Sequence, residues 1–361
     1  MYNQKNITQT VSRLVFCVGL LLGNIAVAQT EFFNSKIPFS ENQLSNFYSS
    51  ISIDSSQVYL NANDYKIYAY DKKTGALNWS YYVANKSNNA PKLYQDNVFI
   101  EKHISEYVDK CIQLNVKTGD TIQTLSIVSI NTQPIFKGNI MYCTAIDTET
   151  GGIVLAYDLK KNAVIWKKFI AHGVDKQPYY LKDKIIANAE ENNWFELNYS
   201  GKLLDTKCKH KATLFAEDIK CIRNFRYLIH NQKELSVSYF DIDEVLKLKY
   251  TKDKTIVLGE NKMLIINNKN KIENEVKLEE IVPFTENRVS NYTEILKAEA
   301  NTVWLIYLDT LVIYDLKKNK TVKTFDLIQW NVHQAILEDN NLWLISRNDG
   351  QLVKLELDNR Y

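Results

Sequence analysis

The sequence has few cysteines and no cysteine pattern that marks a metal or redox site. Five of its 361 residues are Cys, no two of them are adjacent, and none forms a C-x-x-C pair. The five histidines do not show metal-ligand spacing either. We therefore predict no catalytic, cofactor-binding or metal-ligating residues, and we favour a protein that is not an enzyme and needs no cofactor.

An excess of charge of one sign is also missing. The formal net charge is +2, and residues 1–28 contain two basic and no acidic residues, so residues 29–361 carry 42 of each sign. Because nucleic-acid binding depends on clustered Lys and Arg, this balance argues against a nucleic-acid partner. After residue 28 the sequence has no apolar run long enough to cross a bilayer, which argues against a membrane-spanning protein.

Residues 1–28 have the three parts of a secretory signal peptide. A polar start with Lys5 and Arg13 precedes an apolar run over Leu14–Leu22, and small residues follow at Ala26–Ala28. This pattern predicts cleavage near Ala28. The mature protein would then begin at Gln29 and be secreted or periplasmic.

Four cysteines remain after this cleavage, and the sequence leaves their state open. In an oxidising compartment one disulfide can form, and Cys208 and Cys221 are the nearest pair along the chain. The alternative is free cysteines buried in strands, above all Cys111 and Cys143.

A short unit at Ile67–Trp79 recurs along the chain. It begins with β-branched and aromatic residues typical of a strand, turns between Asp71 and Gly75, and reaches Trp79 four residues later. We interpret the repeated residues as structural. They are Asp71, Gly75, Trp79, Asn115, Gly119, Asp158, Trp166 and Asp315.

An acidic residue or Asn ends the repeated strand at intervals of 44, 43, 40, 43, 26, 48 and 41 residues. These anchors are Asp71, Asn115, Asp158, Asn198, Asp241, Asn267, Asp315 and Glu356. Six of the seven intervals fit one four-stranded antiparallel blade of a β-propeller. We therefore predict an all-β fold in which residues 29–361 form a single propeller domain of eight blades. Seven blades is the alternative, because the 26-residue interval is too short for a blade.

The two ends of the chain complement each other. Only five residues follow Glu356, too few for a fourth strand, while residues 30–40 precede the first full repeat and belong to none. A propeller must close without an open sheet edge. We predict that the N-terminal segment pairs with the last blade as its outer strand.

The segment from Asp71 to Trp79 resembles the repeat of quinoprotein-like (PQQ-like repeat) β-propellers, and the resemblance covers about residues 50–201 and, less closely, 290–357. It implies that the tryptophans dock between adjacent blades. The family includes quinone-dependent dehydrogenases and cofactor-free, protein-binding propellers of the BamB type. The enzymes typically carry an adjacent cysteine pair, which this chain lacks. Gln123, Asp205 and Lys323 stand near the places of further docking tryptophans.

Aromatic residues are plentiful, with 22 Tyr, 14 Phe and 6 Trp, and exposed aromatics are favoured at protein and sugar interfaces. We predict an exported, non-enzymatic propeller that serves as a protein- or peptide-binding scaffold in the cell envelope. One alternative is a carbohydrate-binding or carbohydrate-active propeller, which aromatic platforms with paired carboxylates would favour. The other is a quinoprotein-like dehydrogenase, which an axial cavity with converging Asp, Asn and Arg would favour.

Overall fold

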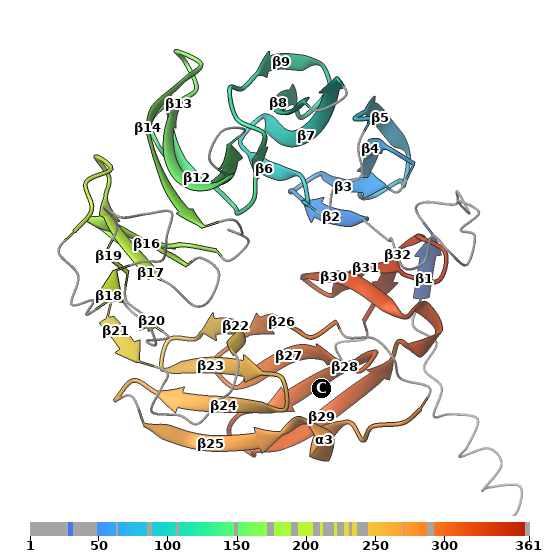
Figure 1. The fold of residues 1–361 in the computed structure, drawn as a ribbon. Coiled ribbons are helices and arrows are strands. Elements are labelled where there is room, and N and C mark those ends of the chain that lie inside the picture. The colour runs from blue at the N-terminus through green and yellow to red at the C-terminus, as the bar shows by residue number, and fades with distance from the viewer. Residues whose placement is uncertain are drawn as a thin grey trace, which may run out of the picture.

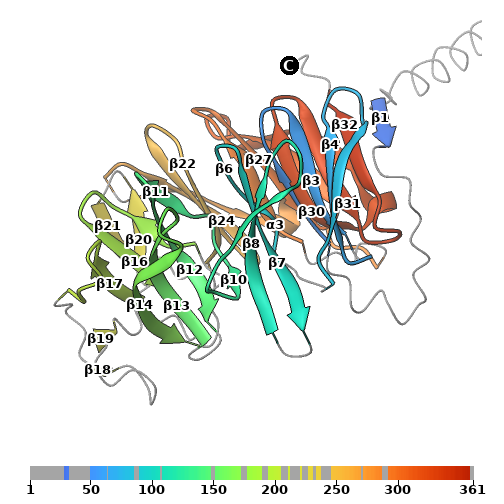
Figure 2. The same cartoon turned by 90° about the horizontal axis from the view of Figure 1, so that it is seen from above.

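In the computed structural model the strands form a ring of antiparallel sheets (Figure 1). The structure describes residues 28–31, 49–62, 64–84, 89–105, 108–147, 151–171, 177–188, 194–204, 210–211, 220–221, 227–230, 233–236, 245–269, 271–286 and 292–357. Within these ranges seven sheets contain three or more strands, so the protein is a seven-bladed all-β propeller. Figure 2 shows the ring turned by 90°, with the blades standing beside one another.

The blades follow one another in chain order, and each runs from an inner strand to an outer one. Blade 1 has β2 (Ser50–Ile53), β3 (Gln57–Ala62), β4 (Lys66–Asp71) and β5 (Leu77–Tyr82). Blade 2 has β6 (Lys92–Tyr94), β7 (Asn97–Ser105), β8 (Val108–Asn115) and β9 (Thr121–Thr124). Blade 3 has β10 (Ser129–Ile130), β11 (Ile135–Lys137), β12 (Ile140–Asp147), β13 (Gly151–Asp158) and β14 (Ala163–Ala171). Blade 4 has β15 (Tyr179–Tyr180), β16 (Lys184–Asn188) and β17 (Trp194–Asn198).

The second half of the ring follows the same plan. Blade 5 has β22 (Val245–Tyr250), β23 (Lys254–Gly259), β24 (Lys262–Asn267) and β25 (Ile272–Lys277). Blade 6 has β26 (Glu294–Ala298), β27 (Thr302–Tyr307), β28 (Thr310–Asp315) and β29 (Lys320–Asp326). Blade 7 has β30 (Val332–Glu338), β31 (Asn341–Ser346), β32 (Leu352–Glu356) and β1 (Ala28–Glu31). In the part of the chain that the structure describes, two short helical turns connect blades, α3 (Leu278–Ile281) and η3 (Ile328–Trp330). No helix in the described part of the chain is long and apolar enough to cross a membrane.

The prediction of eight blades is wrong, and the alternative of seven is confirmed. Counting Asp241 as an anchor produces the eighth blade, and this residue lies outside the described ranges. Between blades 4 and 5 the structure has two hairpins, β18 (His210–Lys211) with β19 (Lys220–Cys221) and β20 (Tyr227–His230) with β21 (Lys233–Ser236). These hairpins pair over two and four residues, which is too little sheet for a blade.

Closure of the ring by an N-terminal strand is confirmed. β1 pairs antiparallel with β32, in a register that runs from Ala28 opposite Glu356 to Glu31 opposite Val353. The first residues of the chain that the structure describes thus complete the sheet formed by the last ones. The rest of the predicted N-terminal segment, residues 32–40, lies outside the described residues.

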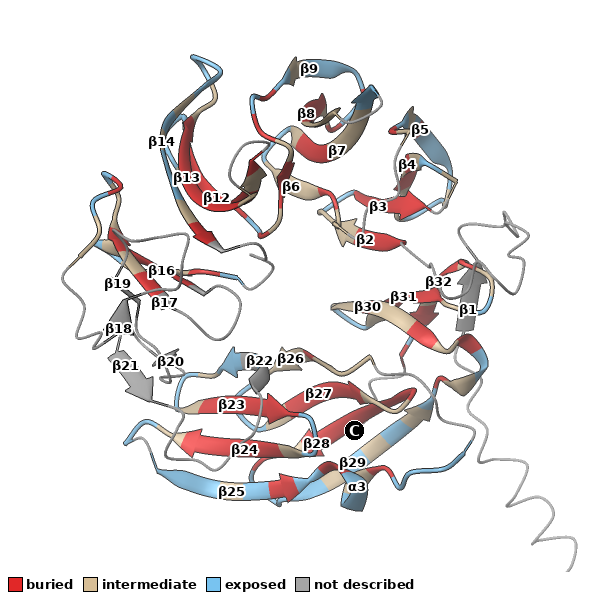
Figure 3. Cartoon of the chain, in the orientation of Figure 1, coloured by how far each residue is buried: buried red, intermediate tan, exposed pale blue. Residues whose placement is uncertain are grey.

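The apolar core is divided among the junctions between blades. Every residue of β3 is buried, because this strand lies between two neighbouring blades, and successive side chains point to opposite faces. Val58 and Leu60 pack toward blade 7, while Tyr59 packs toward blade 2. Figure 3 shows buried middle strands and exposed outer strands such as β25.

Candidate functional site

The anchor residues of the repeat shape the turn between the third and outer strands. Oδ1 of Asp71 accepts hydrogen bonds from the backbone N–H groups of Lys73 (2.9 Å) and Thr74 (2.8 Å), and these bonds hold the pKa of the carboxyl below its usual value. Gly75 closes the same turn with a φ of +71°, where a residue without Cβ is favoured. The anchors of other blades accept backbone N–H groups in the same way; they are Asn115, Asp158, Asn198, Asn267 and Asp315.

Trp79 docks the outer strand of blade 1 onto the corresponding turn of blade 2. Its indole Nε1 donates to the carbonyl oxygen of Val116 at 2.9 Å, and the ring packs on Gly119, whose φ is +73°. A Cβ on residue 119 would lie 2.7 Å from the indole, so glycine is required for the ring to fit.

Trp166 repeats this arrangement between blades 3 and 4. Its Nε1 donates to the carbonyl oxygen of Tyr199 at 3.1 Å, and its ring lies 2.5 Å from the position that a Cβ of Gly201 would take. Val116 and Tyr199 each directly follow an anchor, so the same backbone carbonyl receives the indole N–H in both junctions.

Gln123 occupies the docking position between blades 2 and 3. It lies opposite Gln113 in the β8–β9 pair, just as Trp79 lies opposite Ala69 in the β4–β5 pair. Its Nε2 donates to the carbonyl oxygen of Leu159 at 3.1 Å, and Leu159 again directly follows an anchor. The amide therefore keeps the hydrogen bond of the docking tryptophan but not the volume of its ring.

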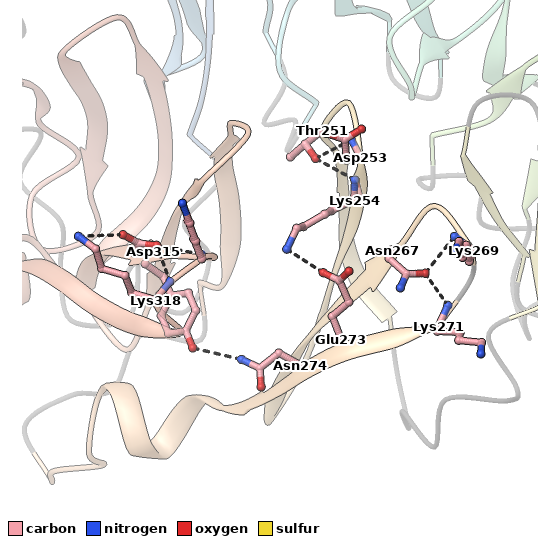
Figure 4. Close-up of polar contacts among 12 residues, drawn as sticks. Thr251, Asp253, Lys254, Asn267, Lys269, Lys271, Glu273, Asn274, Asp315 and Lys318 are labelled. Carbon is pink, nitrogen blue, oxygen red and sulfur yellow. Dashed lines mark hydrogen bonds and ion pairs between the residues drawn. The ribbon is translucent and has the colours of Figure 1, made fainter.

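In four junctions the residue at the docking position is matched to a residue of the turn that it meets. Both indoles face a glycine, whereas Gln123 faces the turn that contains Asn162, a positive-φ residue at +53°. Between blades 5 and 6, Asn274 takes the docking position and donates to the hydroxyl of Tyr314 at 3.4 Å (Figure 4). The turn there contains Asn319, with a φ of +48°. A ring is thus paired with glycine, and a carboxamide is paired with asparagine, which tolerates this conformation.

A cavity of about 560 Å³ lies where blades 2 and 3 meet. Gln123 and Gln113 line it, together with Leu159 on the opposing turn. The cavity therefore lies at the position that an indole ring occupies in the junctions of Trp79 and Trp166. Its volume is within the range of small-molecule sites, about 300–1,000 Å³, and we consider it the candidate binding site.

The outer strands form a second candidate surface. Each of β5, β9, β14, β25 and β29 is the last strand of its sheet among the described residues and contains a one-residue bulge beside the docking position. The bulged residue is exposed and aliphatic in three blades: Ile122 is 50% exposed, Ile165 51% and Val322 45%. Leu77, next to the bulge in blade 1, is 50% exposed.

Within the described ranges, no group of three His, Cys, Asp or Glu residues could hold a metal ion. Cys111 and Cys143 are buried and free, and burial raises the pKa of the Cys143 thiol to about 12. Cys208 lies outside the described residues, so its predicted pairing with Cys221 stays a prediction.

His333 is a histidine whose surroundings lower its pKa. It is half-buried on β30, and Nη2 of Arg347 lies 3.3 Å from its Nδ1. Burial first, and the Arg347 charge second, lower the pKa of His333 to about 4.

We expect His333 to make the folded protein less stable in mild acid. Between pH 6.5 and 4, His333 is protonated in the unfolded chain but stays neutral in the folded chain. The free energy of unfolding therefore falls as the pH is lowered through this window. The full shift corresponds to about 3 kcal/mol, and we expect about 2 because the side chain is partly exposed. Urea unfolding at pH 7 and pH 4.5 measures this loss. A His333→Gln variant should lose about 2 kcal/mol less than the wild type between the two pH values; an identical loss would contradict this assignment.

The sequence located the docking positions of Trp79, Gln123 and Trp166 but missed Asn274 and both candidate surfaces, and the predicted position of Asp205 lies outside the described residues. Alignment of the repeats places Gln123 near a tryptophan position, yet the cavity depends on the neighbouring residues as well. The bulges leave no signal in the sequence, because they arise from the register of paired strands.

The ring of four-stranded antiparallel blades and the docking geometry define the chain as a β-propeller. Residues 40–168 match the family described as outer membrane protein assembly factor BamB, and this stretch includes blades 1 and 2 and most of blade 3. The predicted resemblance to quinoprotein-like propellers is thereby confirmed over this stretch, and the described sheets of the whole chain form a β-propeller. No curated protein matches it significantly.

Two solved structures are similar to this chain. BamB from Moraxella catarrhalis is 14% identical, with 87% of this chain and 84% of that chain covered and a TM-score of 0.48. The computationally designed Ika8 protein is 14% identical, with 86% of this chain and 96% of that chain covered and a TM-score of 0.58. The likeness to Ika8 shows the propeller fold alone.

Proposed function

We propose that this protein is exported and acts as a non-enzymatic scaffold in the cell envelope, where it binds an extended segment of a partner protein along its outer strands. The observation that carries the proposal is the exposed aliphatic side chain that recurs at the bulge of the outer strand in three blades. Ile122, Ile165 and Val322 occupy the same place in three blades.

Such a surface suits recognition by strand addition. The outer edge of a blade offers backbone N–H and C=O groups to an added strand, and exposed apolar side chains beside it supply burial.

The similarity of residues 40–168 to the family of an outer membrane protein assembly factor supports a location in the envelope and a protein partner. The signal-peptide pattern of residues 1–28 supports export, and an intact mass that begins at Gln29 is the expected result for envelope-fraction protein.

Leu77 and Ile165 provide the test of the partner surface. We expect a double variant, Leu77→Asp with Ile165→Asp, to recover at least tenfold less of the main partner than the wild type in affinity capture from the native envelope, because charges replace the apolar contacts. The matched control is Ser80→Asp with Lys168→Asp, which changes exposed residues of the same two strands. Equal recovery with wild type and the double variant would refute an outer-strand interface.

A further inference from the structure

The cavity between blades 2 and 3 has a floor of linked carboxamides. Gln113 is only 6% exposed; its Nε2 donates to Oδ1 of Asn97 at 2.7 Å, and its Oε1 accepts from Nε2 of Gln123 at 2.6 Å. Nε2 of Gln123 also donates to the carbonyl of Leu159, so both of its hydrogens are used. Oε1 of Gln123 has no hydrogen-bond partner among the residues that the structure describes, and Gln123 lines the cavity.

Three further polar side chains stand around the floor. Gln95 and Asn139 add two carboxamides from the β6–β7 and β11–β12 turns, and Lys160 adds an ammonium group from the turn after β13. None of these side chains makes a hydrogen bond or ion pair within the described part of the chain. Each carboxamide can both donate and accept, which matches ligand hydroxyl groups that do the same.

The remaining walls are apolar, and the site has no acidic residue. The rings of Tyr94 and Phe136 lie parallel, with centroids 3.4 Å apart, and both line the cavity beside Ile122. Because no Asp or Glu lines it, the cavity offers no negative charge to a cationic ligand. Glycoside hydrolysis ordinarily needs a pair of carboxylates, so the lining fits binding and not cleavage.

An indole ring from a partner fits this cavity poorly, although the two neighbouring junctions hold one. Where Trp79 docks, the turn residue is Gly119, and a Cβ there would lie 2.7 Å from the ring. In the cavity's own turn the positive-φ residue is Asn162, which carries a Cβ. A ring seated as in the other junctions would collide with it.

We propose that the cavity between blades 2 and 3 binds a saccharide, either neutral or anionic. The carboxamides bind its hydroxyl groups, the apolar walls cover the C–H face of the ring, and Lys160 accommodates an acidic substituent. This site shares Ile122 with the outer-strand surface used by the proposed function. Leu77 and Ile165, which test that surface, do not line the cavity, so each proposal can be tested without the other.

The first test is a titration of the full-length wild-type protein with three probes, methyl glucoside, N-acetylglucosamine and glucuronate, which offer hydroxyl, acetamide and carboxylate groups. We expect at least one to saturate with a Kd at or below about 1 mM, and to shift the side-chain amide NMR signals of Gln95 and Asn139. If none of the three saturates, or if these signals do not move, the proposal is overturned. Saturation of the same signals by N-acetyltryptophanamide in place of the sugars would also overturn it and assign the cavity to an aromatic side chain.

The second test uses variants of exposed residues that keep the fold. We expect Lys160→Ala and Asn139→Ala each to weaken binding of the saturating sugar at least threefold. Lys117→Ala is the matched control, because Lys117 holds the same place in the turn that Trp79 fills, and its affinity should equal that of the wild type. Equal weakening by Lys117→Ala and Lys160→Ala would contradict the site.

A third variant closes the cavity. Gln123→Trp with Asn162→Gly rebuilds the pairing of indole and glycine seen in two other junctions, and we expect it to unfold cooperatively while its affinity for the sugar falls at least tenfold. Unchanged affinity in this folded variant would place the sugar elsewhere.

Discussion

Replacing Trp79 with Ala is expected to lower the free energy of unfolding by about 3–5 kcal/mol, the usual cost of removing a buried tryptophan. The side chain is 7% exposed, packs among the apolar residues of blades 1 and 2, and donates its N–H to a buried carbonyl. Truncation leaves a cavity, removes one of the two hydrogen bonds that the carbonyl of Val116 accepts and removes the ring that rests on Gly119. Equilibrium unfolding in urea, followed by circular dichroism, measures the loss.

Gln123→Ala is the matched control for this substitution, because Gln123 holds the same position one blade further on. It removes hydrogen bonds but no ring, and we expect a loss of about 1 kcal/mol. Trp79→Ala with unchanged stability but no capture of the envelope partner would mean that the indole is a recognition residue and not a packing one.

Deleting residues 29–31, the part of β1 that remains after the predicted cleavage, is expected to lower the free energy of unfolding by about 2–3 kcal/mol, since these residues form three paired positions and each net hydrogen bond contributes about 1 kcal/mol. The deletion also exposes the edge of β32 between Val353 and Leu355. An unpaired edge is a template for association with other chains. We therefore expect the variant to aggregate at concentrations at which the intact protein stays monodisperse, as light scattering will show.

The control for the deletion is a chain that begins at Gln29 and so keeps these three pairs with β32. It should unfold at the same urea concentration as the full-length protein. If instead the deleted chain and the control are equally stable, the pairing of β1 with β32 does not stabilise the ring.

The ring could be predicted from the sequence because its turns are made locally. Asp71 bonds the backbone of its own turn, and Asp158 and Asp315 do the same, so one short pattern encodes each copy. The blade count could not be predicted in this way. Asp241 has the residue type of an anchor, but only strand pairing distinguishes a blade from the two hairpins that lie between blades 4 and 5.

The cavity could not be predicted either, although Gln123 could be placed by counting. In blade 1 the docking ring lies beside Gln57, and blade 2 has the shorter Asn97 at the same place, opposite its own anchor. Gln113 replaces the small Ala69 beneath the ring position. The space that results depends on the combined lengths of these side chains, which a repeat pattern does not report.

The pairing of β1 with β32 also sets an order of events during synthesis. Blades 1, 2, 5 and 6 are each built from consecutive residues, so they can form as soon as their own stretch of chain is available. The last blade joins the first strand made to the last ones, and bringing such distant segments together is slow because the intervening chain must first be ordered. Until Leu352–Glu356 emerges, β1 has no partner, and the first blade lacks the neighbour that covers Val58 and Leu60. A chain that stalls or ends early therefore leaves both the edge of β1 and the apolar face of blade 1 exposed to association with other chains. Only completion of the last blade covers both.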